Sequence, residues 1–254
     1  MLQRNESNLQ RFLDRLTSRS VLSAMEQQAI LNLPTYAAHA RAGEDFVHLG
    51  ERVTHVCFVV DGLVGRFDQN AHGARQITAL HIPGEMPDLH SVVQPTATSA
   101  LHALSPATIL RVPHEAVRAV AAAHPAIAEA LWRDCMVDSM ILAQWVVNVG
   151  CRDAKTRIAH LICEMACRYN AKRLSSRIVF NLPMTQLHLA EATGLTAVHV
   201  NRMLGELRSH GVEFRRGTVY ITEWDRLVRA GDFDPDYLQA DVRPEERIRI
   251  LQAG

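Results

Sequence analysis

The residues best suited to recognising another molecule lie in one stretch, Thr185–Arg208, which reads TQLHLAEATGLTAVHVNRMLGELR. Threonine is a good helix N-cap, and Thr185 and Thr196 each stand where a short helix could begin. Gly194 lies between the two helices, and glycine readily adopts the positive φ of a sharp turn. The stretch therefore predicts two short helices joined by a tight turn, a helix-turn-helix.

The second of these helices has an inner and an outer face. Val200, Met203, Leu204 and Leu207 recur at helical spacing and should face inward. The residues left for the outer face are small, polar or basic: Ala197, Val198, His199, Asn201, Arg202 and Arg208. Such an outer face is typical of a helix that enters the major groove of DNA.

A short hairpin is predicted directly after this motif, in the sequence HGVEFRRGTVYITEW. Its strands are Val212–Phe214 and Val219–Ile221, with a turn around Gly217. Arg215 and Arg216 stand at the tip, where guanidinium groups could contact phosphates. The hairpin is the wing of a winged helix-turn-helix, and it makes the DNA-binding interpretation much stronger than paired helices alone.

The distribution of charge agrees with this interpretation, although the whole chain has a formal net charge of zero. Residues 1–150 carry 11 Lys/Arg against 14 Asp/Glu, and residues 230–254 carry 3 against 6. Residues 151–229 carry 13 against 7. A basic segment between acidic ones indicates that this part of the chain meets a polyanion.

Composition predicts a soluble globular protein, with 48% hydrophobic and 21% charged residues. No apolar run approaches the ~20 residues needed to cross a bilayer, and the polar N-terminus has no signal-peptide core, so we expect a cytoplasmic protein. The five cysteines are scattered and predict no disulfide framework. Cys163 and Cys167 would share a helix face, and we interpret them as core residues rather than a metal or redox pair.

The rest of the chain must position this basic segment. Short apolar runs separated by turn residues fill Phe46–Pro113 and predict an antiparallel sandwich or barrel. A long helix is predicted over Ala126–Val149, and Asp153 could cap the next helix. Along the long helix we expect a heptad seam for a second copy of the chain. Its predicted members are Leu131, Cys135, Asp138, Leu142, Trp145 and Val149.

Several segments together resemble one known family. They are the LAEATGLT turn, VNRMLGELRSHGV, the wing, RIAHLICEMA at Arg157–Ala166, VCFVVDGLV, and PGE at Pro83–Glu85. In this order the sequence resembles the Crp/Fnr transcriptional regulators, essentially to about residue 230. The resemblance implies an α+β fold, with a double-stranded β-helix of the cyclic-nucleotide-binding type, a dimerisation helix and a winged helix-turn-helix. It also implies a homodimer, palindromic promoter DNA and RNA polymerase as partners.

On this basis we expect four regions. They are a sensor or effector domain at 1–123, a dimerisation helix at 124–150, a DNA-binding domain at 151–232 and a C-terminal tail at 233–254.

The effector segment departs from the family members that bind cyclic nucleotides. Those members carry Gly-Glu-Leu and then an Arg-Ser pair that holds the phosphate. Gly84 and Glu85 match, but Thr96 and Ala97 replace the Arg-Ser pair, which argues against cAMP. No cysteine precedes Cys57, which argues against the iron–sulfur cluster of oxygen-sensing members. We expect no bound cofactor, and the candidate residues for another effector are Gly84, Glu85, Asp88, Thr96, Ala97 and Thr98.

The second helix departs from the family as well. Members that read a TGTGA-like half-site use an Arg-Glu…Arg set, and here Ala197 and Val198 replace its first two residues. Arg202 matches the last and would donate to O6 and N7 of a guanine, while Val198 could contact a thymine methyl group. The alternative for Arg202 is an ion pair with Glu206, which is worth only ~0.3–0.5 kcal/mol.

Other residues complete the predicted DNA contacts. His199 and Asn201 are candidates for bases or phosphates. Thr185, Gln186 and Thr196 lie at helix N-termini, which favour phosphates.

Two other functions remain open from the sequence. The chain could be a ligand-binding module that acts through protein contacts, and salt dependence of DNA binding would separate that from a regulator. It could also be a metal-dependent enzyme built on the β-rich domain. His72, His81, His90 and His102 are the metal candidates there, but no HxH-type pair is present, so we predict neither a metal site nor catalytic residues.

Overall fold

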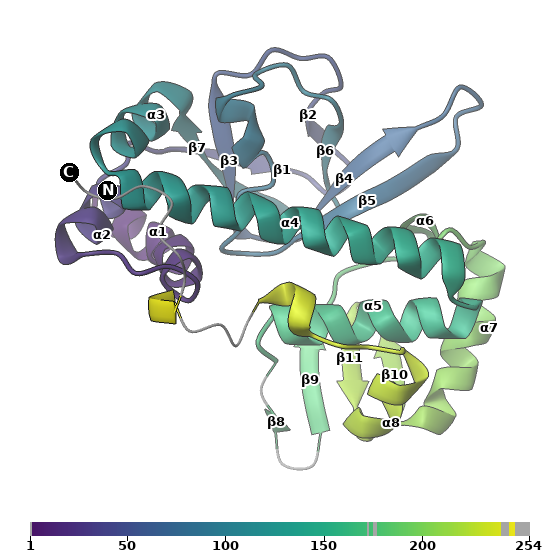
Figure 1. The fold of residues 1–254 in the computed structure, drawn as a ribbon. Coiled ribbons are helices and arrows are strands. Elements are labelled where there is room, and N and C mark those ends of the chain that lie inside the picture. The colour runs from purple at the N-terminus through teal and green to yellow at the C-terminus, as the bar shows by residue number, and fades with distance from the viewer. Residues whose placement is uncertain (1, 172, 175–176, 240–243, 247–254) are drawn as a thin grey trace. The chain divides into compact units, whose positions relative to one another are not determined.

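The computed structural model describes residues 2–171, 173–174, 177–239 and 244–246 (Figure 1). The chain forms two compact units, which we describe separately. Of the described residues, the first unit contains 2–66, 81–139, 239 and 244–246, and the second contains 67–80, 140–171, 173–174 and 177–238. None of the described helices is both long and apolar enough to span a membrane.

The first unit is a β-roll preceded and followed by helices. Its elements are α1 (Leu2–Thr17), α2 (Ala24–Leu31), β1 (Tyr36–Ala40), β2 (Asp45–Val47), β3 (His55–Asp61), β4 (Val64–Gln69), β5 (Arg75–His81), η1 (Leu89–Val92), β6 (Ala100–Ala103), β7 (Ala107–Pro113), α3 (His114–Ala123), the start of α4 (Pro125–Cys151), and η4 (Pro244–Glu246). Two sheets form the roll, in the orders β1-β7-β3 and β2-β6-β4-β5. The end of β4 and all of β5 except His81, within residues 67–80, are grouped with the second unit. The expected β-rich domain followed by a long helix is therefore confirmed.

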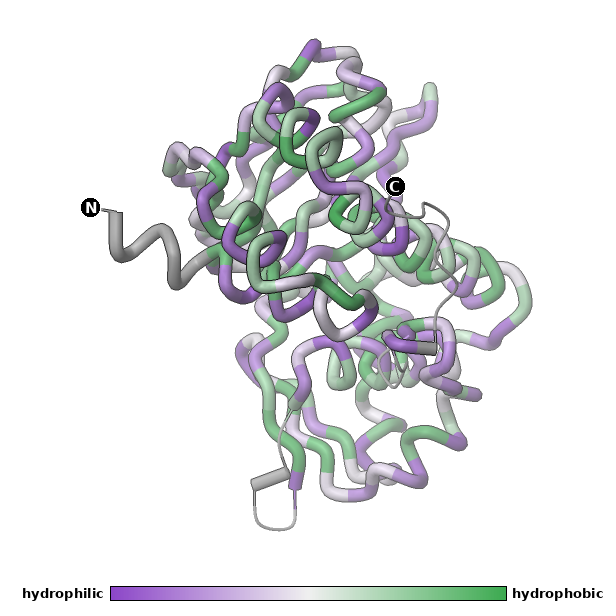
Figure 2. The backbone as a smooth tube through the Cα atoms, turned by 60° about the vertical axis from the view of Figure 1, so that its left-hand side comes forward, coloured by the Kyte–Doolittle hydropathy of each residue, from purple (hydrophilic) through white to green (hydrophobic). Residues whose placement is uncertain are grey.

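The core of the roll follows from alternation along its strands, where buried and exposed residues point to opposite faces. Figure 2 shows hydrophobic stretches alternating with hydrophilic ones along the chain. One buried cluster lies between the two sheets and includes Val59, Val64 and Ile109. A second joins Phe12 of α1 and Phe58 of β3 to Ile127 of α4, so the N-terminal helix is part of the core.

A buried ion-pair network fixes α1 to α4. The guanidinium group of Arg15 lies 2.9 Å from a Glu85 oxygen, 2.7 Å from Asp134 and 3.4 Å from Asp138. Arg19 lies 3.0 Å from Asp134. Burial, with the nearby Asp134 carboxylate, raises the pKa of Asp138 to about 7. Burial also lowers the pKa of Arg19 to about 10. Three carboxylates thus share two guanidinium groups, and Glu85 and Asp134 are the most deeply buried of the five side chains.

The second unit is a winged helix-turn-helix. Its elements are the end of α4, then α5 (Ala154–Arg168), β8 (Arg173–Leu174), β9 (Arg177–Asn181), α6 (Gln186–Thr193), α7 (Ala197–Leu207), η2 (Arg208–His210), β10 (Val212–Arg215), β11 (Thr218–Ile221), α8 (Trp224–Ala230) and η3 (Asp236–Leu238). Asp153 caps α5 by accepting from Thr156 N at 2.9 Å, as predicted. Cys163 is fully buried in α5, in keeping with a core residue.

The seam predicted on α4 is wrong in register. Trp145 is 5% exposed and its Nε1 donates to Glu164, and Asp138 is paired with Arg15. Leu131 and Cys135 pack against the core of their own unit, and Val149 is half-buried, so Leu142 alone of the predicted set is exposed. The exposed apolar residues on this helix are Trp132, Met136, Leu142, Val146 and Val147.

Three of these residues, Trp132, Met136 and Val146, belong to a different stripe, one position along in the sequence from the predicted seam. Trp132, Met136, Ser139, Ala143, Val146 and Gly150 are spaced 4, 3, 4, 3 and 4 apart, and all six are exposed. The prediction failed because α4 is apolar around most of its circumference, so spacing alone could not tell which face covers the chain's own core. Hereafter we call these six residues the α4 stripe.

The C-terminal residues up to Leu238 pack on α5. Tyr237 donates to Glu164 at 2.9 Å and stacks on His160, whose ring also meets Phe233 edge to face. The last part of the tail, for which the sequence suggested either a docked helix or disorder, lies largely outside the described residues.

We predict that Tyr237→Phe lowers the free energy of unfolding by about 1–2 kcal/mol, because a buried carboxylate loses one of its donors while the ring remains. Chemical denaturation with tryptophan fluorescence measures the change. Tyr36→Phe is the matched control, because Tyr36 is 65% exposed and its removal should change stability little. Equal stability of the Tyr237 variant and the wild-type protein would contradict the role given to this hydroxyl.

Candidate nucleic-acid interface

The helix-turn-helix forms because its local hydrogen bonds are supplied by the expected residues. The Thr185 hydroxyl accepts from His188 N at 3.1 Å, and the Thr196 hydroxyl accepts from His199 N at 3.3 Å. Gly194 ends α6 with φ of 65°, in the left-handed region. The ring of His188 completes the cap of α6 by accepting from the backbone N–H of Thr185. The turn and both helix starts therefore lie where the sequence placed them.

Packing decides which side of α7 is available. Val200, Met203 and Leu207 are buried, and Leu204 is half-buried. Val198 is 83% exposed, and Asn201 and Arg202 are exposed beside it, whereas Ala197 and His199 are half-buried. Leu187 of α6 is 58% exposed. The open face of the motif thus carries apolar and hydrogen-bonding groups together.

Arg202 is held toward the N-terminal half of α7. One of its guanidinium nitrogens lies 2.6 Å from Nε2 of His199. Among the described residues there is no ion pair between Arg202 and Glu206, which was the alternative assignment. Gln186 at the start of α6 donates to the side chain of Asn201 at 3.2 Å. These contacts join the N-terminal ends of the two helices into one polar surface.

The wing forms a four-stranded sheet in the order β10-β11-β9-β8. Arg216 and Gly217 have φ of 48° and 75°, so both central residues of the turn are left-handed, as a type I′ hairpin requires. Arg215 and Arg216 are exposed at the tip, and Arg215 forms an ion pair with Glu213. Sequence reasoning missed β9, whose Asn181 accepts from the hydroxyl of Thr218 at 3.2 Å.

The candidate effector residues are only partly brought together. Asp88, Ala97 and Thr98 line one small cavity with Arg66 and Ser91. Its volume is about 10 Å³, close to that of a single water molecule. Thr96 does not line this cavity and instead forms a β-bridge with Arg52. The predicted pocket is therefore largely filled by the chain itself.

Gly84 and Glu85 serve the fold at this place. Gly84 has φ of 103°, which favours glycine, and its N–H donates to Val59 at 2.9 Å. Glu85 is 3% exposed, accepts from Ile82 N and is paired with Arg15 of α1. The carboxylate that the resemblance assigned to an effector is thus engaged by the N-terminal helix.

The histidines considered as metal ligands do not converge. His102 lies 2.5 Å from Asp45, and His81 lies 3.6 Å from Glu85. Within the part of the chain that the structure describes, no three His, Cys, Asp or Glu side chains are arranged to hold a metal ion.

Two models of known protein domains match this chain. A model of the Crp-like helix-turn-helix domain matches residues 156–230, and a model of the cyclic nucleotide-binding domain matches residues 38–124. The chain belongs to the Crp/Fnr family. The two matches occur in the order typical of its transcriptional regulators, and they agree with the family resemblance read from the sequence.

Individual family members are distant relatives. The "Anaerobic regulatory protein" of Haemophilus influenzae is 25% identical over 173 residues, which is 68% of this chain and 66% of that protein, slightly under two thirds of its length. The "Transcriptional activator protein FnrL" of Cereibacter sphaeroides is 25% identical over 222 residues, covering 83% of this chain and 86% of that protein.

A solved structure has the same fold. FixK2 from Bradyrhizobium japonicum superposes with a TM-score of 0.70 at 24% identity, over 78% of this chain and 98% of FixK2.

The buried carboxyl of Asp88 yields a pH prediction. Its Oδ1 accepts from Cys57 N at 2.7 Å, while Oδ2 is buried without a hydrogen-bond partner among the described residues. Burial raises its pKa to about 7, from 3.8 in the unfolded chain. Between these values the folded protein binds more protons than the unfolded one, so this carboxyl makes stability fall as the pH rises from about 4 to 7.

We predict that Asp88→Asn gains stability relative to the wild-type protein across this interval, by up to about 1.4 kcal/mol per pH unit, and that the difference is constant above pH 7. Denaturant titrations of both proteins at pH 4.5, 5.5, 6.5 and 8 measure it. Asp68→Asn, at an exposed residue near the end of β4, is the control, and it should keep the wild-type trend because it leaves Asp88 in place. A difference that is flat from pH 4.5 to 8 would contradict the raised pKa.

Proposed function

We propose that the chain is a sequence-specific DNA-binding transcription regulator that acts as a homodimer on palindromic promoter DNA. The observation that carries the proposal is the exposed N-terminal half of α7, with Val198, Asn201 and Arg202 beside a basic wing. A helix of this shape enters the major groove, and Arg202 presents a planar set of donors to a guanine. Arg215 and Arg216 contact the phosphates that flank the groove.

The proposed partners are double-stranded DNA, a second copy of the chain and RNA polymerase, and the protein is not an enzyme. The α4 stripe is the proposed contact between the two copies, because it offers apolar and small side chains at heptad spacing. A twofold dimer would place two α7 helices about one turn of DNA apart. The same proposal includes independence from cAMP and from an iron–sulfur cluster, supported by Thr96 and Ala97 and by the lack of cysteine before Cys57.

The first test is Arg202→Ala. We expect a loss of roughly 1–3 kcal/mol of binding free energy and relaxed selectivity at one base pair of each half-site, because one bidentate contact is removed. Fluorescence anisotropy measures the affinity for a duplex selected by the wild-type protein from a random library, and for its single-base variants.

Arg226→Ala is the matched control for this test, since Arg226 is exposed on α8 away from the recognition helix. It should keep the affinity and selectivity of the wild-type protein. Wild-type selectivity in the Arg202 variant would contradict the assigned contact. Binding that does not weaken with salt would contradict DNA as the partner and favour a module that acts through protein contacts.

The dimer is tested by Val146→Glu. Val146 is 62% exposed and lies between Ala143 and Gly150 in the α4 stripe. A glutamate at this position would bring one negative charge from each copy into the proposed contact. We expect the dissociation constant of the dimer to rise at least about tenfold, since this corresponds to only about 1.4 kcal/mol. Sedimentation equilibrium measures it.

Val93→Glu makes the same change at a residue that is 83% exposed outside α4, and it should leave the dimer intact. If both glutamate variants remain dimeric to the same extent as the wild-type protein, the α4 stripe is not the contact.

A further inference from the structure

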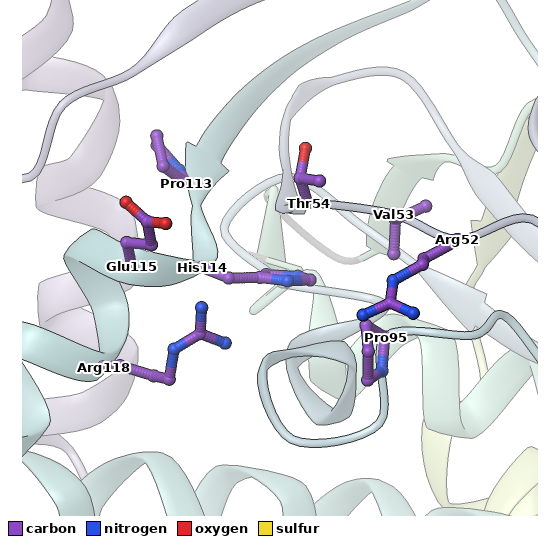
Figure 3. Close-up of a pocket in the computed structure, with 8 residues that line it drawn as sticks. All are labelled: Arg52, Val53, Thr54, Pro95, Pro113, His114, Glu115 and Arg118. Carbon is purple, nitrogen blue, oxygen red and sulfur yellow. The ribbon is translucent and has the colours of Figure 1, made fainter.

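A larger cavity, of about 390 Å³, opens elsewhere in the first unit. It lies between three segments that are distant in sequence: the chain just before β3, the loop after η1, and the start of α3. Its lining residues are Arg52, Val53, Thr54, Pro95, Pro113, His114, Glu115 and Arg118 (Figure 3). It shares only Val53 with the small filled cavity of the candidate effector segment. Its volume lies in the range of small-molecule sites, roughly 300–1,000 Å³.

The charged groups of this cavity favour an anion. Figure 3 shows the guanidinium groups of Arg52 and Arg118 on either side of the His114 ring. Glu115 is the only carboxylate among the lining residues, so with a neutral histidine the lining is net positive. Burial and the nearby Arg118 lower the pKa of His114, which keeps its ring neutral at pH 7.

Several hydrogen-bond donors in the cavity are available to a ligand. Within the described residues the side chain of Arg52 has neither a hydrogen bond nor an ion pair, although its backbone forms the β-bridge with Thr96. Arg118 uses only Nη1, which donates to Val92 O at 2.9 Å. Pro113 precedes α3 and supplies no side-chain cap to the first turn of this helix. The N–H of His114 donates to Thr54 O at 3.0 Å, so the N–H groups that follow it in the first turn add a third source of donors, beside the hydroxyl of Thr54.

We propose that this cavity binds a small phosphorylated metabolite. The phosphate would lie between Arg52 and Arg118 at the start of α3, and its organic part would lie against Val53, Pro95 and Pro113. Two guanidinium groups match the charge of a phosphomonoester, about −1.5 to −2 at pH 7. A phosphate is preferred to a carboxylate because donors approach from more than one plane, which suits three terminal oxygens better than two.

The site is connected to the segment first considered for an effector. His114 Nε2 lies 2.8 Å from the hydroxyl of Ser91, and Arg118 donates to Val92, so both lining residues hold η1. Leu89 of the same η1 packs in the cluster that contains Ile127 of α4. A ligand that recruits Arg118 competes with its bond to Val92, so occupancy of the cavity and the position of η1 are linked.

Calorimetric titration of the full chain with phenyl phosphate, benzoate and phenol, at constant ionic strength, tests the proposal. We expect one phenyl phosphate per chain, at least tenfold weaker binding of benzoate, and no heat from phenol. Arg52→Gln and Arg118→Gln should each weaken the binding of phenyl phosphate at least tenfold. Arg41→Gln, an equal change of charge at an exposed residue outside the cavity, should not.

Three results would overturn the proposal. One is no binding of phenyl phosphate at millimolar concentration. Another is binding that Arg52→Gln leaves unchanged, which would place the phosphate elsewhere, such as on the DNA-binding surface. The third is benzoate binding as tightly as phenyl phosphate, which would make this a carboxylate site. The side chain of Arg52 is exposed and makes no hydrogen bond among the described residues, so the Arg52 variant keeps the test valid if Arg118→Gln disturbs η1.

Discussion

The second unit depends on one buried carboxylate. Glu164 of α5 is 0% exposed, and its two oxygens accept from Trp145 of α4, from Arg168 of α5 and from Tyr237 of η3, each at 2.9 Å. A buried charge is costly unless it is paired and hydrogen-bonded, so all three donors are required together. Because they come from three elements, satisfying Glu164 fixes the end of α4 and the C-terminal residues against the same helix.

This constraint explains how one helix could serve two surfaces. Trp145 faces Glu164, whereas Ala143, Val146 and Gly150 of the α4 stripe lie on the exposed side of the same turns. The opposite faces of α4 thus have separate tasks, internal attachment and the proposed contact with a second copy. α5 in turn packs on α7, so Glu164 attaches the end of α4 to the same helix on which the recognition helix packs.

Local chemistry made the DNA-binding surface predictable from the sequence. Thr185, Thr196 and Gly194 act through bonds to residues within four positions, so their types and spacing were sufficient. The seam on α4 was not predictable, because Trp145 and Val146 are both apolar and only tertiary contacts decide which one is buried. Glu164 was missed for the same reason: its partners Trp145 and Tyr237 lie 19 and 73 residues away.

The first unit shows how a family pattern can persist while the use of its residues changes. Glu85 keeps the family's position, yet Arg15 of α1 now neutralises it, and the cavity beside Asp88 has room for about one water molecule. Admitting a larger ligand there would require displacing buried side chains around a carboxyl that already resists ionisation. The open cavity at Arg52 and Arg118 requires no such displacement, and its hydrogen bonds reach the same η1. A ligand in the open cavity could therefore act on η1 without entering the small cavity beside Asp88.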